Sequence, residues 1–390
     1  MHPASAQYDP PRDAPSGGIG APLEAARRIT LGASVSHDSN VFRVPNLSSD
    51  PQSETIATGF AGLRIDKPYA QQRYFLDATA TAYRYRKFSH LDFTGLDYRA
   101  AWYWRLTPRL SGTLSADQTQ SPTQFQEMVG RQSNVATTGN YVFNLDGWLF
   151  GGWHVLLGAS QSNRTSEQSS LSNQPDYREF RGEFGVRYLF QSSSEIAVVG
   201  RRIDGDQGSR LINNVVVVSS TNYREDQSEL RGFWKLSSQS EFTGRATYLD
   251  RRYDQTPGNN FHGTAGELGY TWLPTSKLSL RLTATRNIAP WQGSPSSNYT
   301  VSNTLSIAPT WQATATTSVY MTLQRIYDAY PSTGNTERKD TTSIAGLGVN
   351  WRALRNLSLG ANVLRQQRSS NDPFVEYDAT IARLSASLLF

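Results

Sequence analysis

Ile381-Ala382-Arg383-Leu384-Ser385-Ala386-Ser387-Leu388-Leu389-Phe390 ends the chain, and this stretch decides the fold. Apolar residues occupy every second position: Ala382, Leu384, Ala386, Leu388 and Phe390. Arg383, Ser385 and Ser387 stand between them. A side-chain period of two is that of a β-strand whose two faces meet different surroundings. The stretch therefore predicts a strand with one face toward lipid and the other toward water.

The same alternation recurs from about residue 29 to the end, with turn-forming residues between the segments. Leu278, Leu280 and Leu282, for example, alternate with polar neighbours. The predicted strands lie at 29–37, 55–65, 73–86, 90–105, 109–117, 133–144, 148–161, 177–190, 195–204, 223–236, 241–252, 261–272, 278–288, 299–311, 317–327, 340–351, 357–368 and 377–390. The chain is thus predicted to be all-β, with about eighteen antiparallel strands (sixteen to eighteen).

Connector lengths separate a membrane barrel from a soluble sandwich, in which alternation also occurs. Tight turns are predicted at 106–108, 191–194, 273–277 and 352–356. Longer loops are predicted at 118–132, 162–176 and 205–222. Short turns on one side and long loops on the other are typical of bacterial outer-membrane barrels, whose short turns are periplasmic. We therefore expect an integral outer-membrane protein of a Gram-negative bacterium, with both termini in the periplasm.

Composition excludes several other classes of protein. No apolar run approaches the roughly 18 residues of a membrane-spanning helix, and charged residues make up only 18% of the 390 residues. The absence of cysteine excludes a disulfide scaffold and a thiolate metal site. The net charge of +5 is dispersed, which argues against nucleic-acid binding.

The first residues differ from the rest of the chain. Residues 1–27 are rich in Pro, Gly, Ala and charge and are predicted to be a flexible periplasmic segment, with the barrel at 28–390. Ala4-Ser5-Ala6 has the small-x-small form of a signal-peptide cleavage site. We hypothesise that an export signal precedes Met1 in the native protein; an N-terminal sequence of that protein tests this.

Aromatic residues mark one end of the predicted barrel. Most of the nine tryptophans lie beside the short turns, and amphipathic rings favour the membrane–water boundary. A periplasmic aromatic girdle is predicted from Trp104, Trp234, Trp272, Trp311 and Trp351. Phe390 at the end of an amphipathic strand resembles the C-terminal signal that engages the barrel-assembly machinery.

The polar faces of the strands predict the lumen. Arg181, Glu183, Arg187, Arg231, Arg245, Arg281 and Arg383 are expected to line it and to contact a polar solute. Arg84, Arg99, Glu179, Glu229, Glu241 and Glu267 are predicted to face inward with them. The same pattern also fits charges that only pair across strands and keep the interior wet.

Sequence motifs give little support for catalysis. The five histidines are widely separated and lie in no zinc-binding pattern, so no metal, cofactor or catalytic residue is predicted. His37-Asp38 and His90 with Asp92 are the nearest approach to the catalytic pair of an outer-membrane hydrolase. We therefore expect a protein that is not an enzyme.

The segment 32–44, Gly-Ala-Ser-Val-Ser-His-Asp-Ser-Asn-Val-Phe-Arg-Val, closes the first strand and opens the first loop. It resembles the corresponding stretch of the exosortase-associated exopolysaccharide-biosynthesis outer-membrane proteins (EpsL type), at Asp38, Ser39, Asn40, Phe42 and Arg43. Related β-barrel porins carry a similar motif. Asp38, Ser39 and Asn40 are also turn formers, so Arg43 suits a loop anchor better than a sugar contact.

The resemblance implies export of extracellular polysaccharide beside an envelope-spanning biosynthesis system. Its partners would then be the secreted polysaccharide and periplasmic or inner-membrane export proteins, besides outer-membrane lipid, lipopolysaccharide and the barrel-assembly machinery. Three alternatives stay open: a general or substrate-specific porin for small polar solutes, a barrel hydrolase, and an adhesive barrel whose long loops, such as 205–222, are the working part.

Overall fold

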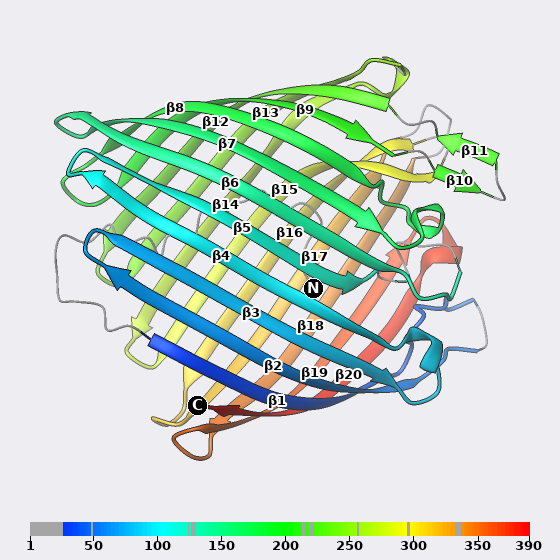
Figure 1. Cartoon of the computed structure of the whole chain (residues 1–390). Coiled ribbons are helices and arrows are strands. Elements are labelled where there is room, and N and C mark those ends of the chain that lie inside the picture. Colours follow the sequence, from blue (N-terminus) through cyan, green and yellow to red (C-terminus); the bar gives the residue numbers. More distant parts are fainter. Residues whose placement is uncertain are drawn as a thin grey trace.

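The computed structural model describes residues 26–390 except 48–49, 124, 126–129, 209, 213–214, 219–220, 256, 295–296 and 332–336. Eighteen strands form a single antiparallel sheet that closes on itself (Figure 1). Strand β1 (Ala26–Asp38) pairs with β2 (Glu54–Tyr69) on one side and with the last strand, β20 (Tyr377–Leu389), on the other. The all-β, closed-barrel prediction is therefore confirmed.

The other barrel strands follow in chain order, each beside the one before it. They are β3 (Gln72–Tyr85), β4 (Phe93–Thr107), β5 (Leu110–Pro122), β6 (Val135–Phe150), β7 (Trp153–Ser166), β8 (Tyr177–Leu189), β9 (Glu195–Gln207), β12 (Thr221–Ser237), β13 (Ser240–Tyr253), β14 (Phe261–Thr275), β15 (Leu278–Ser294), β16 (Ser297–Gln312), β17 (Thr317–Tyr330), β18 (Arg338–Arg352) and β19 (Leu357–Ser370). Every predicted strand is present, and most are a few residues longer than predicted.

The connections hold a few short elements. A hairpin of β10 (Arg210–Ile212) and β11 (Val215–Val218), which was not predicted, lies between β9 and β12. Single 3-10 turns occur at Ser89–Leu91, Ser169–Leu171, Pro257–Asn259 and Pro373–Val375. No helix among the described residues is long and apolar enough to cross a membrane.

The two ends of the barrel differ as predicted. The turns after β2, β4, β6 and the other even-numbered strands of the barrel are short, and β1 begins and β20 ends beside them (Figure 1). The backbone of Phe390 exchanges two hydrogen bonds with Ile29, of 2.8 and 3.0 Å, which extends the β1–β20 seam to the last residue. Short turns place this end, with the start of β1 and the end of β20, in the periplasm.

The outer surface is apolar because alternate side chains of each strand point away from the lumen. Large hydrophobic residues at these positions are exposed, among them Ile29, Leu63, Phe184, Val198, Leu230, Leu347 and Leu384. Such a belt meets lipid and not water.

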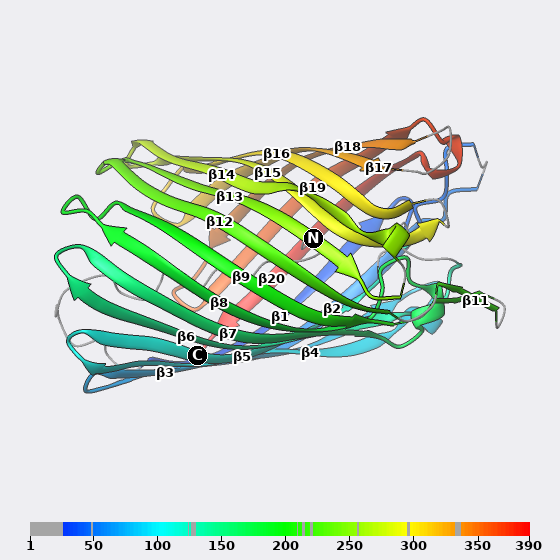
Figure 2. The same cartoon turned by 90° about the horizontal axis from the view of Figure 1, so that it is seen from above.

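The barrel is flattened in cross-section. Its outline across the strands is broader in Figure 1 than in Figure 2, which shows it after a quarter turn. Strands β2 to β7 form one broad face and β14 to β18 the opposite one, and the wall bends sharply at β8, β9, β12 and β13. At that bend, side chains from strands that are not neighbours come within contact distance. Arg251 on β13, for example, lies 3.6 Å from Glu179 on β8, across β9 and β12.

Candidate functional site

The inner surface of the barrel is the candidate site, and the strand registers define which residues face it. Arg383 alternates with the outward Leu384 and lies opposite Ser36 and Asn362, so it faces the lumen. The same argument places Arg181, Glu183, Arg187, Arg231, Arg245 and Arg281 on the inner face. It also places Arg99, Glu179, Glu229, Glu241 and Glu267 there.

Arg84 does not face inward, so that prediction is wrong. Its register partner is Ala57, on the outer face of β2. Arg84 stands at the long-loop end of β3, where outward positions have left the apolar belt and can carry charge.

A chain of buried ion pairs occupies the inner face at the sharp bend. We call the inner face of β8, β9, β12 and β13 the paired-charge edge. At its centre the side chain of Glu229 is fully buried and receives two hydrogen bonds from Arg201, at 2.8 and 2.9 Å. Thr247 donates to Glu229 at 2.9 Å, and Arg231 donates as well. Arg201 also bonds Glu183 at 2.7 Å, so this group is satisfied from several strands.

A second group lies nearer the long loops on the same edge. Arg251 bonds Glu225 at 2.6 Å and stacks over Tyr223, whose hydroxyl donates to Glu179. Below these ion pairs, on the short-turn side, Arg187 bonds Asp146 and lies 3.5 Å from Glu195. Most inward charges of this edge are therefore held in ion pairs, whereas Glu241 of β13 is exposed.

Arg201, Glu225 and Arg251 were missed by sequence reasoning. Strand β9 alternates poorly because Arg201 points inward while Arg202 and Asp204 point outward. The outward pair stands beyond the lipid belt, where Arg202 bonds Asp226 at 3.0 Å. Glu195 faces inward, and every second residue after it lies on the same face. Counting along the strand in this way could have identified Arg201 as inward.

The opposite part of the lumen has a different chemistry. The inward residues of β15, β16, β17, β19 and β20, which we call the hydroxyl wall, carry mainly hydroxyl and amide groups. They include Ser279, Thr283, Thr285, Ser302, Thr304, Ser306, Thr310, Ser318, Thr322, Gln324, Asn362, Gln366, Ser385 and Ser387. Arg281 and Arg383 stand on this wall, are exposed, and form no ion pair with any described residue.

Exposure of the inner side chains changes along the barrel axis. Arg281, Asn350 and Arg383, nearer the short turns, are exposed. Gln366 and Arg368, nearer the long loops, are only 4% and 7% exposed. Asp340 of β18 is buried between them and bonds Arg338, Arg368 and Ser370. The lumen is thus lined by solvated groups toward the periplasm and by packed groups toward the cell surface.

The first loop is tied to the barrel seam by the motif predicted there. Asp38 accepts from the backbone of Asn40 at 2.9 Å and pairs with Arg43 at 2.9 Å. The Asn40 side chain bonds both backbone groups of Val44 and the carbonyl of Asp378 on β20. Ser39 exchanges bonds with Thr380. Arg43, in the left-handed region at φ 52°, is an anchor within this knot.

Phe42 lies at the centre of an aromatic group formed by three loops. Its ring centre is 4.7 Å from those of both Phe88 and Phe125, edge to face. Arg131 lies over the same ring at 5.1 Å, and Val41, Val44 and Leu91 complete the buried cluster. This packing covers part of the long-loop end.

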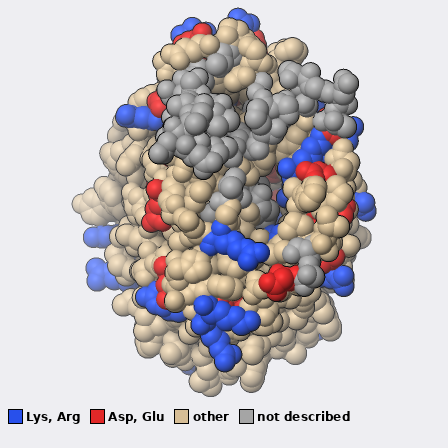
Figure 3. All heavy atoms as spheres, turned by 90° about the vertical axis from the view of Figure 1, so that its right-hand side faces the viewer, with Lys and Arg blue, Asp and Glu red and all other residues tan. Residues whose placement is uncertain are grey.

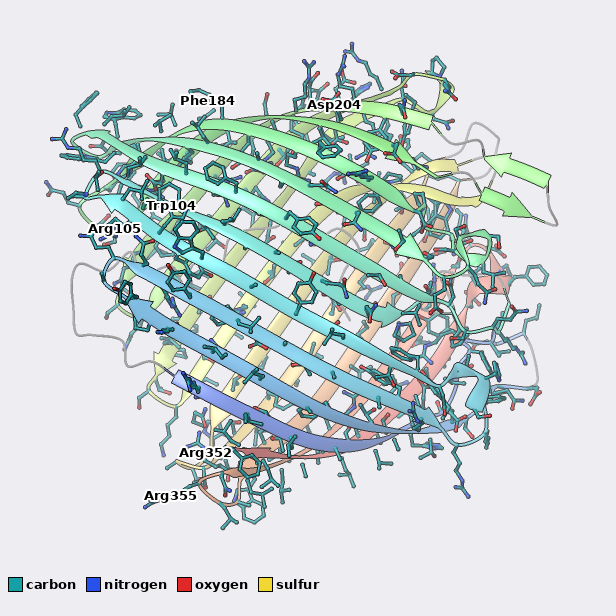
Figure 4. The ribbon with its side chains drawn as sticks, viewed as in Figure 1. Trp104, Arg105, Phe184, Asp204, Arg352 and Arg355 are labelled. Carbon is teal, nitrogen blue, oxygen red and sulfur yellow. The ribbon has the colours of Figure 1, made fainter. Side chains whose placement is uncertain are left out.

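The tryptophans gather at the short-turn end. Trp234, Trp272, Trp311 and Trp351 face outward and are 42–50% exposed. Trp104 faces outward too but is only 8% exposed, because its ring lies over Gly112, where a Cβ atom would come within 2.3 Å of it. Figure 4 shows Trp104, Arg105, Arg352 and Arg355 at this end. Trp102, Trp148 and Trp153 also lie here and were not predicted.

The candidate hydrolase pairs are not assembled. His37 and Asp38 are successive residues of β1 and point to opposite faces, and His37 contacts Thr55 at 3.2 Å. His90 contacts the carbonyl of Arg131 at 3.0 Å. Within the described part of the chain, no three His, Asp or Glu side chains are placed to hold a metal ion.

A closed eighteen-strand barrel with an apolar outer belt and a polar lumen defines an integral outer-membrane β-barrel, and that is the class and location of this protein. Residues 226–390 match the family described as "Putative beta-barrel porin 2". No curated protein sequence matches the chain.

Among solved structures, the chain is similar to Pseudomonas aeruginosa OpdK, in a crystal structure with vanillate, with 10% identity, a TM-score of 0.50, and coverage of 93% of this chain and 99% of that one. A second OpdK structure has 10% identity and a TM-score of 0.50, and the match covers 94% of this chain and 99% of that one. The alcaligin outer-membrane receptor FauA of Bordetella pertussis has 10% identity and a TM-score of 0.46, and the match covers 92% of this chain and 76% of that one. The OpdK likeness bears on the fold alone.

Proposed function

We propose that the protein is a passive outer-membrane channel for small polar solutes and that it favours anions. The observation that carries this proposal is the pair of exposed, inward arginines on the hydroxyl wall, Arg281 and Arg383, without ion-pair partners in the described part of the chain. The porin description of the family matched by residues 226–390 supports the coarser part of the proposal. No covalent chemistry is required of any residue.

Transport of this kind needs binding that is weak at each site and repeated along the path. Hydroxyl groups such as those of Thr283 and Ser306 can replace part of a solute's hydration shell. Arg281 and Arg383 add a positive potential because no carboxylate of the described chain neutralises them. The paired-charge edge contributes little net potential, since its arginines and glutamates cancel locally.

Ion selectivity tests the proposal. The full chain is refolded in detergent and inserted into a planar bilayer under a tenfold KCl gradient. The sign of its reversal potential should be that of a channel more permeable to chloride than to potassium. Arg281→Glu with Arg383→Glu should shift that potential toward cation selectivity. The control is the neutral exchange Arg245→Gln with Glu267→Gln, which removes an ion pair of 3.4 Å without changing the net charge of the lumen and should change the potential little. A cation-selective native channel, or equal shifts in both variants, would contradict the proposal.

The second candidate is export of extracellular polysaccharide, with the secreted polymer and envelope export proteins as partners. It is supported by the resemblance at 32–44 and by the hydroxyl wall, whose groups suit a polyhydroxylated chain. The motif itself is bonded within the first loop, so its residues support the likeness without supplying a sugar contact. In a strain lacking the gene, surface loss with periplasmic retention of the polymer would favour export; unchanged surface polymer would favour the small-solute channel.

A further inference from the structure

A groove on the outer surface of the barrel combines apolar and basic walls. It has a volume of about 350 Å³ and crosses β16 to β19. Leu305, Ile307 and Leu323 form its apolar side and are exposed on the lipid-facing surface. Arg325 and Arg365 stand over it from β17 and β19.

The registers explain why the surface is hollow at this place. On β18 the outward residues are the small Ser343 and Ala345. Arg325 lies opposite Ser343, and Arg365 lies opposite Ala345, so a long side chain flanks the short ones on each side. Two guanidinium groups therefore overlook one hollow.

The charge of this groove is not balanced within the described part of the chain. Arg325 has no acidic partner among the described residues and rests near the ring of Tyr327, at 5.3 Å. Arg365 lies 3.6 Å from Asp378, in a pair whose side chains are 68% and 41% exposed. Exposed pairs of this kind are weak, so both arginines can bind another anion.

The opposite edge of the barrel differs in this respect. On the outer face of β9, β12 and β13, Arg202 bonds Asp226 and Arg224 bonds Asp204, both at 3.0 Å. Arg252 bonds Asp250 there at 2.5 Å. Figure 3 shows basic side chains around the rim at the long-loop end, with acidic ones among them.

We propose that the groove on β16 to β19 binds a phosphorylated glycolipid of the outer leaflet, of the lipopolysaccharide type. Arg325 and Arg365 lie in the halves of their strands nearer the long loops, which face the cell surface. Phosphate is the anion that paired guanidinium groups hold best, through charge-assisted hydrogen bonds. An acyl chain fits along Leu305, Ile307 and Leu323 below the phosphate.

Native mass spectrometry of the full chain in detergent, titrated with diphosphoryl lipid A, tests the proposal. The double variant Arg325→Gln and Arg365→Gln should bind the lipid about thirtyfold more weakly. This is the loss of affinity expected when two arginines that attract anionic lipid are removed. The control is the neutral exchange Arg224→Gln with Asp204→Asn, outward at the same end, which should change binding less than about threefold. Heat-modifiable migration in gels checks that each variant is folded.

A second variant keeps both arginines and removes the hollow. Ala345→Leu places a larger side chain between Arg325 and Arg365 and should weaken lipid A binding about tenfold. Native affinity in both the double variant and Ala345→Leu would overturn the proposal. Equal binding of dephosphorylated lipid A, or full competition by phosphatidylglycerol, would also overturn it, the latter by assigning the groove to a phospholipid.

Discussion

The paired-charge edge and the short-turn half of the hydroxyl wall face the same lumen but differ in whether their arginines are paired. Arg368, at the long-loop end of the wall, is paired with Asp340. Arg201 on the edge is 6% exposed and is held by Glu183, Gln227 and Glu229. Arg281 on the wall is exposed and is held by no carboxylate of the described chain. The wall bends sharply at the edge (Figure 2), and there inward side chains of strands that are not neighbours come into contact, as for Arg251 and Glu179. We therefore expect the edge to stabilise the barrel and, under the proposed function, the wall to be the part of the lumen that a solute contacts.

Removing Glu229 should break this contrast most strongly. Glu229→Gln leaves Arg201 and Arg231 partly unpaired in a buried site, which should lower the free energy of unfolding by about 3 kcal/mol or more. Urea unfolding of barrels refolded in lipid vesicles measures this. Glu241→Gln on the neighbouring strand, at an exposed inward position, should cost less than about 0.5 kcal/mol. Equal costs for the two variants would refute a stabilising role for the edge.

Asp340 offers the same test on the broad face formed by β14 to β18. Its side chain is fully buried and is bonded by Arg338 at 2.7 Å, by Ser370 at 2.6 Å and by Arg368. Asp340→Asn should cost about 2 kcal/mol, because two arginines lose their charged partner but Arg338 can turn to water. If Asp340→Asn lowers the free energy of unfolding by less than Arg245→Gln does in the same assay, burial does not decide how much an ion pair stabilises the barrel.

Arg245 should show a smaller effect. Its bond to Glu267 is 3.4 Å long, and both side chains are partly exposed, at 20% and 43%. Arg245→Gln should reduce the free energy of unfolding by less than about 1 kcal/mol, as for a surface ion pair. A double-mutant cycle with Glu267→Gln isolates the coupling between the two side chains. A coupling as large as that expected of Glu229 would mean that the edge extends further than its buried residues.

Arg281 should have the smallest effect on stability. Arg281→Gln removes a solvated charge with no described partner, so the free energy of unfolding measured in urea should change by no more than about 0.5 kcal/mol. Single-channel conductance of the same sample should nevertheless change. A destabilised variant would indicate that Arg281 has a structural partner, and the wall would then resemble the edge.

Much of the barrel could be predicted because lipid outside and water inside impose a strict period of two. In β20 the residues from Ala382 to Leu388 obey it, and in β15 the leucines and Arg281 fall on the predicted faces. The prediction failed for Arg84 and was weakest for 195–204. Arg84 and the outward Arg202 and Asp204 of β9 lie near the long loops, where the outer face leaves lipid and carries charge at little cost. The hairpin β10–β11 is not part of the barrel wall, so the alternation imposed by lipid and water does not apply to it.

Sequence by itself determined which segments are strands, which end of the barrel carries the short turns, and which side chains of the lipid-embedded part face inward. Only the tertiary structure decided which inward charges are paired. Pairing depends on the register between neighbouring strands, as for Arg201 with Glu229, and on wall curvature, as for Arg251 with Glu179. Neither leaves a mark on the alternation of a single strand. Arg231 and Arg281 therefore look alike in sequence, and only the folded barrel pairs Arg231 with Glu229.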